Sequence, residues 1–402
     1  MMRQAYIIDG IRTAIGNFGG TLSPVRTDDL AAHAIKSLMD RHSNFDFTRV
    51  EDVILGCANQ AGEDNRNVAR MAGLLAGLPV SVAGETVNRL CASGMAAVVH
   101  ASRAIQTNSG DVFIAGGVEH MTRGPWVISK TSKAFGRDAQ MHDSSFGWRF
   151  VNPKLDDAYG TDRMGVTAEN LVEKYGIDRD SQDGFALWSQ QKTAAAIKAG
   201  FFKDEILPIE IPRRKMDSLV FDQDEFPRAN TTLDSLGALR PAFKKGGSVT
   251  AGNSSGLNDG AAALLIASEN AIKSEGLKPM ARIVSSAVAG VEPRIMGIGP
   301  VAASQKALDR AGLTLADMDI LELNEAFSAQ VLACSRALGL DDRDERINPN
   351  GGAISLGHPL GMSGSRILLT AARQLNLTNK RYALVTMCIG VGQGYATIIE
   401  RT

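Results

Sequence analysis

The sequence predicts an α/β protein whose sheets are covered by helices. Apolar runs alternate with helical patterns along most of the 402 residues. Runs such as "VILG" are apolar throughout, which is typical of strands that are buried on both faces. The two ends of the chain carry similar segments, in which a loop with a reactive side chain leads to a helix and then to an apolar strand ending at glycine. We therefore expect two related halves that face one another.

The expected strands follow the apolar runs in chain order. They are "AYIID", "VILGC" and "VFIAGG" near the start, and "ALLIAS", "ARIVSSAV", "ILELNEA", "ALVTM" and "YATIIE" later. The middle of the chain is richer in charge, Trp and Pro, and contains a helical pattern from about Arg179 to Ala199. We therefore predict a first core half at 1–120, completed by 250–275, an inserted segment at 121–249, and a second core half at 276–402.

Composition argues against several classes of protein. The chain is 44% hydrophobic and 22% charged, as soluble globular proteins are. Its net charge of −1 gives no electrostatic reason to expect nucleic acid or a membrane surface as a partner. No apolar run approaches the ~18 residues that span a bilayer, and the N-terminal stretch reads as a strand and turn rather than a signal peptide.

The four cysteines and six histidines are scattered along the chain. The cysteines form no CxxC pair and the histidines no HExxH pattern, so we predict neither a disulfide framework nor a metal site. Free thiols are typical of a reducing compartment, and we expect the protein in the cytoplasm.

Cys91, in "NRLCASGM", directly precedes a predicted helix that we expect Ser93 to cap. A thiol at a helix N-terminus lies at the positive end of the helix dipole, which favours the thiolate. Cys91 is therefore a candidate nucleophile. The alternative is a small buried apolar residue, as many free cysteines are.

His358, in "GGAISLGHPLGMSG", lies in a glycine-dense turn and is followed by Pro359. Such a histidine suits a base that accepts the proton of a thiol, although a loop histidine can also be a simple surface residue. The helices after Cys91 and His358 share a Ser-Gly opening, at Ser93-Gly94 and Ser363-Gly364. Because ligands bind beyond the carboxyl ends of strands in such sheets, we expect the two side chains at equivalent positions that face each other.

Cys388 precedes the loop "GVGQG", which superficially resembles a dinucleotide-binding loop. However, "YATIIE" follows as another strand, so no helix is present to receive a pyrophosphate. We predict a hairpin whose glycines bring backbone N–H groups near a bound group, with Cys388 as a proton-transfer group or as packing.

"LELNEAF" places Asn324 after a strand and at the opening of a predicted helix. The amide of Asn324 is suited to orient a water or an oxyanion, or simply to cap the helix. Glu325 ranks lower, because a carboxylate close to a thiolate opposes the formation of that thiolate.

Together, "NRLCASGM", "NEAF", "GHPLGMSG" and "CIGVGQG" resemble the thiolase family in order and spacing, and the resemblance covers essentially the whole chain. It implies a thiolase-like fold in which two βαβαβαββ halves pack as αβαβα layers. It also implies an inserted loop domain that covers coenzyme A and aids assembly into a homotetramer (a dimer of dimers) or a homodimer.

The resemblance assigns the chemical roles. Cys91 is the nucleophile that becomes acylated, His358 removes its proton, and Cys388 exchanges a proton with the substrate α-carbon. Asn324, through a water, helps His358 to stabilise one oxyanion, and the backbone N–H groups of Cys91 and Gly390 stabilise the other. Coenzyme A is then a co-substrate, with no permanently bound cofactor and no metal.

Further residues match thiolase positions around the substrate. Ser255 and Arg228 match positions near the pantetheine and adenine ends of coenzyme A. Met164 and Phe327 match residues that line the thioester pocket. Arg163 replaces the histidine that biosynthetic thiolases usually carry, so the lip of the pocket differs here.

"GCANQAGEDNRNVARMAGLLAGLP", "GWRFVNP" and "FALWSQQKTAAAIKAGFF" most resemble the β-ketoadipyl-CoA thiolases of aromatic-acid degradation. This resemblance implies cleavage of 3-oxoadipyl-CoA to succinyl-CoA and acetyl-CoA. The alternatives are an acetoacetyl-CoA thiolase (acetyl-CoA acetyltransferase), a broad-chain 3-ketoacyl-CoA thiolase, or a non-catalytic acyl-CoA or lipid carrier. A decarboxylating ketoacyl synthase is disfavoured, because those enzymes lack the second cysteine.

A substrate with a terminal carboxylate calls for a cation in the pocket, because a buried, unpaired carboxylate is costly. Arg149 and Arg163 are the candidates, with Arg123 and Lys154 behind them. The alternative for each of the four is an ordinary salt bridge at the surface or between subunits.

Overall fold

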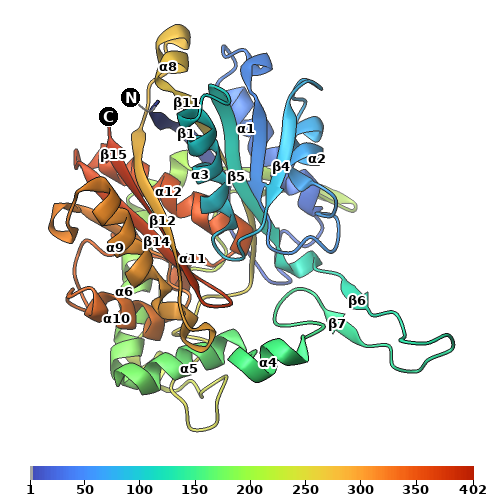
Figure 1. The fold of residues 1–402 in the computed structure, drawn as a ribbon, viewed down its shortest axis with the longest axis vertical. Coiled ribbons are helices and arrows are strands. Elements are labelled where there is room, and N and C mark those ends of the chain that lie inside the picture. The colour runs from blue at the N-terminus through green and yellow to red at the C-terminus, as the bar shows by residue number, and fades with distance from the viewer. Residues whose placement is uncertain (1–2) are drawn as a thin grey trace.

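Two similar β-sheets, one from each half of the chain, form the centre of this computed structural model, which describes residues 3–402 (Figure 1). The first sheet has the strand order β4-β3-β5-β11-β1. Its strands are β1 (Ala5–Thr13), β3 (Asp52–Gly56), β4 (Ala83–Val87), β5 (Val112–His120) and β11 (Asn258–Ser268). The predicted apolar runs in this half all form strands. β4 was not predicted, because it is an edge strand with exposed polar residues.

The second sheet has the order β13-β14-β15-β12. Its strands are β12 (Ala281–Gly290), β13 (Ile320–Leu323), β14 (Tyr382–Ile389) and β15 (Gln393–Arg401), all of them predicted. β14 and β15 form the expected antiparallel hairpin, in which Ile389 pairs with Gln393. Pairing of β1 with β12 through Tyr6 and Ile7 joins the two sheets into one continuous 11-stranded sheet.

The two halves share one strand topology, with one difference. In each half, parallel strands stand at one edge and antiparallel strands at the other. Where the first half has β4, the second half has only a parallel bridge between Leu321 and Ile347. The second half therefore departs from the expected βαβαβαββ pattern, with its third strand reduced to a single pairing.

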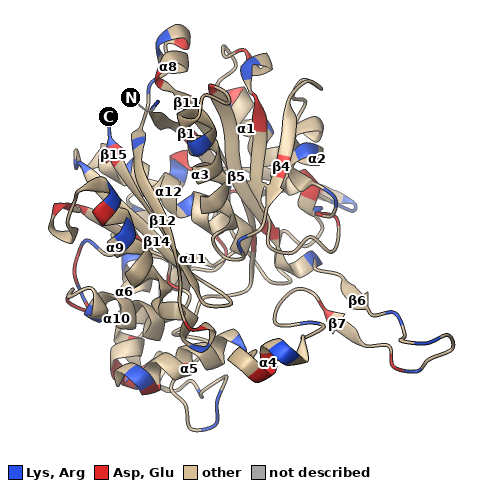
Figure 2. Cartoon of the chain, viewed as in Figure 1, with Lys and Arg blue, Asp and Glu red and all other residues tan. Residues whose placement is uncertain are grey.

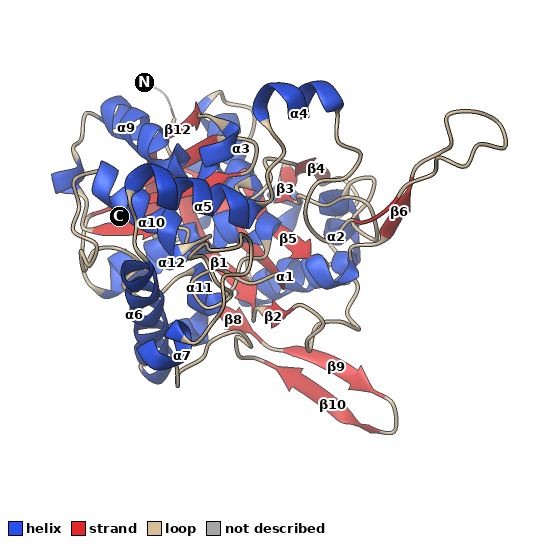
Figure 3. Ribbon diagram, turned by 90° about the horizontal axis from the view of Figure 1, so that it is seen from below, coloured by secondary structure: helices blue, strands red, loops and turns tan. Residues whose placement is uncertain are grey.

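Helices and sheets alternate in five layers (Figures 1 and 3). One apolar cluster joins α1 (Thr27–Arg41) and α2 (Val68–Leu75) to the outer face of the first sheet. A second cluster joins α9 (Gly299–Ala311) and α10 (Ser328–Ala337) to the second sheet. The cluster between the sheets contains α3 (Ser93–Gln106) and α12 (Leu360–Leu377). The predicted αβαβα layering follows from these contacts.

The central helices α3 and α12 touch at their N-termini because both carry glycine there. A Cβ on Gly94 would lie 2.6 Å from the backbone oxygen of Gly361, and a Cβ on Gly364 would lie 2.4 Å from the backbone nitrogen of Met95. Real Cβ atoms do not approach backbone so closely, so glycine is required at both positions. The shared Ser-Gly openings therefore mark the contact that brings the loops before these two helices together.

The segment between β5 and β11 extends away from the sheets. β6 (Trp126–Ile128) and β7 (Met141–Asp143) form a projecting arm, and β9 (Ile209–Arg213) pairs with β10 (Met216–Phe221) in a second projecting hairpin (Figures 1 and 3). The helices α4 (Pro153–Tyr159), α5 (Met164–Tyr175), α6 (Arg179–Lys198) and α7 (Leu233–Gly237) belong to the same segment. α6 matches the helix predicted from about Arg179 to Ala199. The remaining short elements are β2 (Gly16–Asn17), β8 (Ile206–Leu207), α8 (Glu269–Glu275) and α11 (Ala353–Leu356).

Candidate active site

Cys91 lies in the tight turn between β4 and α3. Leu90, one residue before it, has a φ of 47°, a left-handed conformation that is strained for a side chain of this size. The prediction that Ser93 caps the helix is wrong, because α3 begins at Ser93 itself and Ala92 occupies the cap position. The Ser93 hydroxyl instead donates to the Leu90 carbonyl at 2.7 Å and accepts from the Arg89 N–H at 2.8 Å. These two bonds hold the strained turn closed under Cys91.

The expected lowering of the Cys91 pKa is also wrong. Burial of its sulfur raises the pKa of Cys91 to about 11, and this outweighs the N–H groups of Gly390 and of Cys91 itself, which point at the sulfur and lower the pKa. A position before a helix favours the thiolate only while water or a partner solvates it. Cys91 is therefore a thiol at neutral pH, and it needs a base before it can attack.

His358 lies before α12 as Cys91 lies before α3, and its side chain is buried. The Ser363 hydroxyl donates to the Pro359 carbonyl at 2.8 Å and lies 2.6 Å from His358 Nδ1. Since that hydroxyl proton is already used, Ser363 accepts from Nδ1–H, which assigns the lone pair of the ring to Nε2. Burial, and then the buried Arg366 cation, lower the pKa of His358 to about 3. His358 is therefore neutral and has an unprotonated Nε2.

Asn324 follows β13, and its Nδ2 lies 3.4 Å from His358 Nε2. It is not a helix cap, because α10 begins at Ser328 with Phe327 at the cap position. Asn324 Oδ1 is buried and has no hydrogen-bond partner among the described residues, as expected of a group that holds an ordered water. The structure thus brings the side chains of Asn324 and His358 together.

Glu325, the residue next to Asn324, has a structural role. Its carboxylate accepts from the Ser189 hydroxyl at 2.7 Å, from Asn348 Nδ2 at 2.8 Å and from the Ile354 N–H at 3.2 Å. These bonds fix the strand end that carries Asn324 to α6 and to the loop before His358.

Cys388 lies at the end of β14 and is buried. Burial raises the pKa of Cys388 well above its ordinary value, and the electrostatic interaction with Cys91 raises it further. Cys388 shares one apolar cluster with Phe327, and Met164 packs against this cluster. The loop after Cys388 links this cluster to Cys91, because the Gly390 N–H points at the Cys91 sulfur and a Cβ on Gly390 would lie 3.8 Å from the Met164 sulfur.

Glu119, at the end of β5, was missed in the sequence. Its carboxylate accepts three backbone N–H bonds, from Ala58 at 3.0 Å, Asn59 at 2.9 Å and Gly361 at 2.8 Å. Asn258 was missed as well, and its Oδ1 accepts the His358 N–H at 2.9 Å. Both residues act through backbone groups far away in the sequence, so no local pattern identifies them.

The two predicted coenzyme A residues lie farther out. The Ser255 N–H donates to the Ala326 carbonyl at 3.0 Å, which ties Ser255 to the "NEAF" block. Arg228 is exposed, and its backbone N–H donates to Gln190 Oε1 at 2.9 Å. The hydrogen bonds place Ser255 near Asn324 but link Arg228 to none of the reactive residues.

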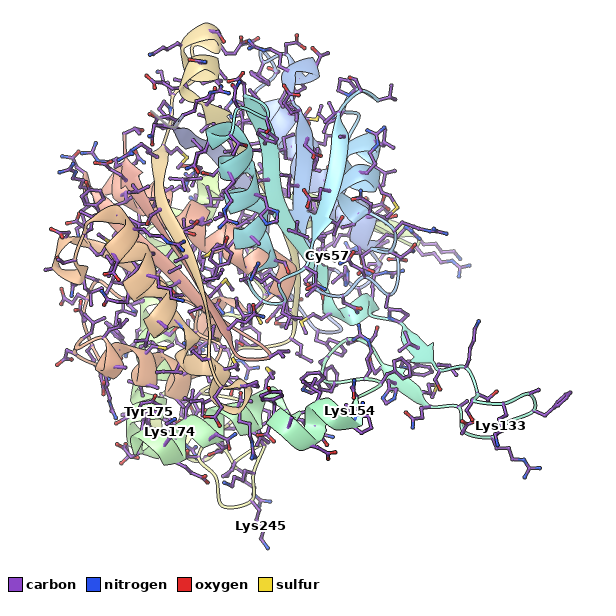
Figure 4. All side chains as sticks on the ribbon, in the orientation of Figure 1. Cys57, Lys133, Lys154, Lys174, Tyr175 and Lys245 are labelled. Atoms are coloured by element: carbon purple, nitrogen blue, oxygen red, sulfur yellow. The ribbon has the colours of Figure 1, made fainter. Side chains whose placement is uncertain are left out.

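The four candidate cations have different surroundings. Arg123 forms an ion pair with Glu63, so its charge is compensated. Arg163 and Lys154 are exposed at the N-terminal ends of α5 and α4, and Figure 2 shows the charged residues along α4. Figure 4 shows Lys154 on α4 and Cys57 at the end of β3. Arg149 is half-buried, and within residues 3–402 its hydrogen bonds go to two neutral acceptors, the Ser144 carbonyl and Asn59 Oδ1.

Residues 3–402 contain no group of three or more His, Cys, Asp or Glu side chains arranged to hold a metal ion. Within the same range, no helix combines the length and apolar character that crossing a bilayer requires.

Comparison with known proteins identifies the class. A family model of the thiolase N-terminal domain matches residues 5–270, and one of the thiolase C-terminal domain matches residues 277–401. The chain belongs to the thiolase family of acyltransferases.

Particular relatives cover the entire chain. It is 57% identical over 400 residues to the 3-oxoadipyl-CoA/3-oxo-5,6-dehydrosuberyl-CoA thiolase of Escherichia coli (strain K12), with 100% of both chains covered. It is 56% identical over 400 residues to a beta-ketoadipyl-CoA thiolase of Acinetobacter baylyi, again with 100% of both covered. The crystal structure of the Bacillus anthracis acetyl-CoA acetyltransferase matches with a TM-score of 0.92 and 42% identity, covering 100% of this chain and 99% of that one. The predicted thiolase-like α/β fold is confirmed.

Proposed function

We propose that this thiolase cleaves 3-oxoadipyl-CoA with coenzyme A to give succinyl-CoA and acetyl-CoA, in the degradation of aromatic compounds. The observation that carries the proposal is the full-length identity of 57% to a 3-oxoadipyl-CoA thiolase, against 48% to the acetyl-CoA acetyltransferase of Escherichia coli (strain K12) and 42% to that of Bacillus anthracis. Coenzyme A is a co-substrate, and the reaction needs no permanently bound cofactor.

In the first half-reaction, His358 Nε2 takes the proton of Cys91, and the sulfur attacks the β-carbonyl carbon of the substrate. The bond between the α- and β-carbons breaks, and its electron pair stays on the α-carbon of the departing acetyl-CoA. Cys388 gives its proton to that carbon, leaving a succinyl thioester on Cys91. Support comes from a neutral His358 beside Asn324 and from the electrostatic interaction between Cys91 and Cys388.

In the second half-reaction, the thiol of coenzyme A loses its proton to the Cys388 thiolate and attacks the succinyl thioester. Cys91 leaves as thiolate and recovers its proton from His358. Negative charge develops on the carbonyl oxygen in both steps. The N–H groups of Cys91 and Gly390, which already point toward the sulfur, are the donors for one oxyanion. Asn324, through a water, and His358 serve the other. Each such donor contributes about 3 kcal/mol to the transition state.

The surrounding residues complete the proposal. Met164, Phe327 and Arg163 line the acyl end of the site, and Ser255 and Arg228 bind the pantetheine and adenine ends of coenzyme A. The inserted segment 121–249, between the core halves 1–120 with 250–275 and 276–402, covers the coenzyme. We place the protein in the cytoplasm, in keeping with its free thiols.

The inserted segment also supports assembly into a homotetramer or a homodimer. Its projecting arm exposes a set of large apolar side chains that monomers seldom leave uncovered, namely Trp126, Ile128, Phe135 and Met141. Light scattering of the double variant Trp126→Ser/Phe135→Ser checks this, because the assembly should become smaller while Cys91 still accepts an acetyl group.

The decisive experiment for the function compares kcat/KM for thiolysis of 3-oxoadipyl-CoA with that for acetoacetyl-CoA. We expect kcat/KM to be about 100-fold or more higher for the dicarboxylic substrate, which is the effect of one hydrogen bond between a protein cation and the substrate carboxylate. Equal values, or a preference for acetoacetyl-CoA, would replace this proposal with that of an acetyl-CoA acetyltransferase or a broad-chain thiolase.

A further inference from the structure

Arg149, between β7 and α4, is a half-buried cation without a carboxylate partner. Its Nη1 donates to the Ser144 carbonyl at 3.2 Å and its Nη2 donates to Asn59 Oδ1 at 3.3 Å. Within residues 3–402, no carboxylate lies at ion-pair distance from Arg149, whereas the buried Arg12 is paired with both Glu205 and Asp224. A guanidinium that is partly removed from water and held only by neutral acceptors favours an anionic ligand.

The two contacts of Arg149 are themselves fixed. Asn59 Nδ2 donates to the Ser144 carbonyl at 3.1 Å and to the Ser144 hydroxyl at 3.2 Å. Asn59 thereby ties the segment that carries Arg149 to the loop after β3. Ser144 and Asn59 are both buried, so the arginine is held from the protein side by a small rigid frame.

That frame adjoins the reactive residues. The N–H groups of Ala58 and Asn59 donate to Glu119, which also accepts the Gly361 N–H in the first turn of α12, directly after His358 and Pro359. On the other side, Asn88 Nδ2 donates to the Ala58 carbonyl at 2.9 Å, and Asn88 Oδ1 accepts from the Leu90 N–H at 2.9 Å, one residue before Cys91. The loop after β3 is therefore hydrogen-bonded to Arg149 on one side and, through Asn88 and Glu119, to the segments that carry Cys91 and His358 on the other.

The other three cations fit an anion-binding role less well. Arg123 is neutralised by Glu63, which it contacts through both Nε and Nη2. Lys154 and Arg163 are exposed, so water solvates their charges and a contact with a substrate carboxylate gains little.

We propose that Arg149, oriented by Asn59 and Ser144, binds the terminal carboxylate of the acyl chain and thereby selects dicarboxylic 3-oxoacyl-CoA substrates. This inference rests on the proposed function. Asn59 and the Ser144 carbonyl occupy one N–H on each Nη, which leaves Nε–H and one N–H on each Nη free. A guanidinium with these donors forms two parallel hydrogen bonds with a carboxylate, which an ammonium group cannot do.

The test uses two substrates of equal chain length, 3-oxoadipyl-CoA and 3-oxohexanoyl-CoA, which differ only in the terminal carboxylate. In Arg149→Met, kcat/KM for 3-oxoadipyl-CoA should fall about 100-fold, as expected for the loss of a charge-assisted hydrogen bond. The value for 3-oxohexanoyl-CoA should change less than about threefold, which also shows that the variant is folded. Arg149→Lys should keep part of the preference, with a loss of about tenfold.

Lys154→Met is the matched control, since it removes a cation from the neighbouring helix. We expect its ratio between the two substrates to equal that of the wild type. The assignment is overturned if Arg149→Met keeps the wild-type ratio, or if Lys154→Met loses it. Either result can be distinguished from an incorrect proposed function. If the proposed function were wrong, the wild-type enzyme itself would show no preference for 3-oxoadipyl-CoA.

Discussion

The loops that precede the two central helices are built alike, but the chain stabilises them in different ways. Each has a left-handed residue directly before its reactive side chain, Leu90 with φ 47° before Cys91 and Gly357 with φ 105° before His358. Glycine adopts such a conformation without strain, whereas leucine does so only under tertiary constraint. The Cys91 turn is thus held by the two bonds of Ser93, and the His358 turn is fixed by Asn258 and Ser363.

This difference explains how a duplicated architecture yields two chemistries. The nucleophile lies in a partly exposed turn where a substrate can reach it, and the base lies in a buried one. Burial keeps the pKa of His358 low and the pKa of Cys91 high, so both groups are neutral before the reaction. The pair is therefore activated only when the thiol proton moves to the imidazole.

The largest effects are expected when the sulfur of Cys91 or of Cys388 is removed, which tests whether the two cysteines have different roles. Cys91→Ala should abolish acyl-enzyme formation and lower thiolysis by more than about 10⁴-fold, since it removes the nucleophile. Cys388→Ala should still form acetyl-Cys91 from acetyl-CoA, as seen by mass spectrometry, but should fail at cleavage of the carbon–carbon bond. Normal acylation of the Cys91→Ala variant would mean that the roles are wrongly assigned.

The pH dependence of Cys91 alkylation tests whether the pair is neutral. Because the pKa of Cys91 is about 11, its thiolate fraction increases with pH up to that value. The rate of alkylation by iodoacetamide, followed at Cys91 by peptide mapping, should therefore rise about tenfold per pH unit between about pH 7 and 10. A preformed thiolate–imidazolium pair would stay ionised from about pH 5 to 8. A rate of alkylation that is constant over that range would therefore contradict this description.

The Gly364→Ala variant tests the close contact between α3 and α12. The added Cβ would meet the backbone nitrogen of Met95 at 2.4 Å, so we expect a loss of about 3 kcal/mol in the free energy of unfolding. Gly184→Ala, within α6, is the matched control, because its Cβ would meet only the flexible end of Arg343 at 3.5 Å. Helix propensity should make that control about 1 kcal/mol more stable. Equal effects in chemical denaturation would argue against the close approach.

The smallest expected effect concerns the orientation of the imidazole. Ser363→Ala removes the acceptor of His358 Nδ1–H and lets the proton shift to Nε2, so kcat should fall about tenfold. Ser365→Ala, two residues further along the same helix, loses a hydroxyl that donates to the Met362 carbonyl at 2.7 Å and does not contact the imidazole. If both variants lost the same activity, the Ser363 contact would be merely structural.

The sequence by itself determined the layered α/β architecture. Strands buried on both faces are apolar along their whole length, so each of them can be recognised in the sequence as an apolar run. It also determined the family, because the four motifs around Cys91, Asn324, His358 and Cys388 are contiguous stretches of chain. β4 escaped prediction because, as an edge strand, it lacks that apolar signal.

Only the tertiary structure decided the protonation of the pair and the surroundings of the cations. A helix N-terminus is visible in sequence, but the burial that raises the pKa of Cys91 comes from parts of the chain far away. Glu119 joins the Asn59 and Gly361 backbones across 60 and 242 positions of the chain. Likewise, the sequence does not distinguish Arg149 from Arg123. In the folded chain Arg123 forms an ion pair with Glu63, whereas Arg149 donates to neutral acceptors. Desolvation and long-range pairing depend on which segments meet in space, and a local pattern does not contain that information.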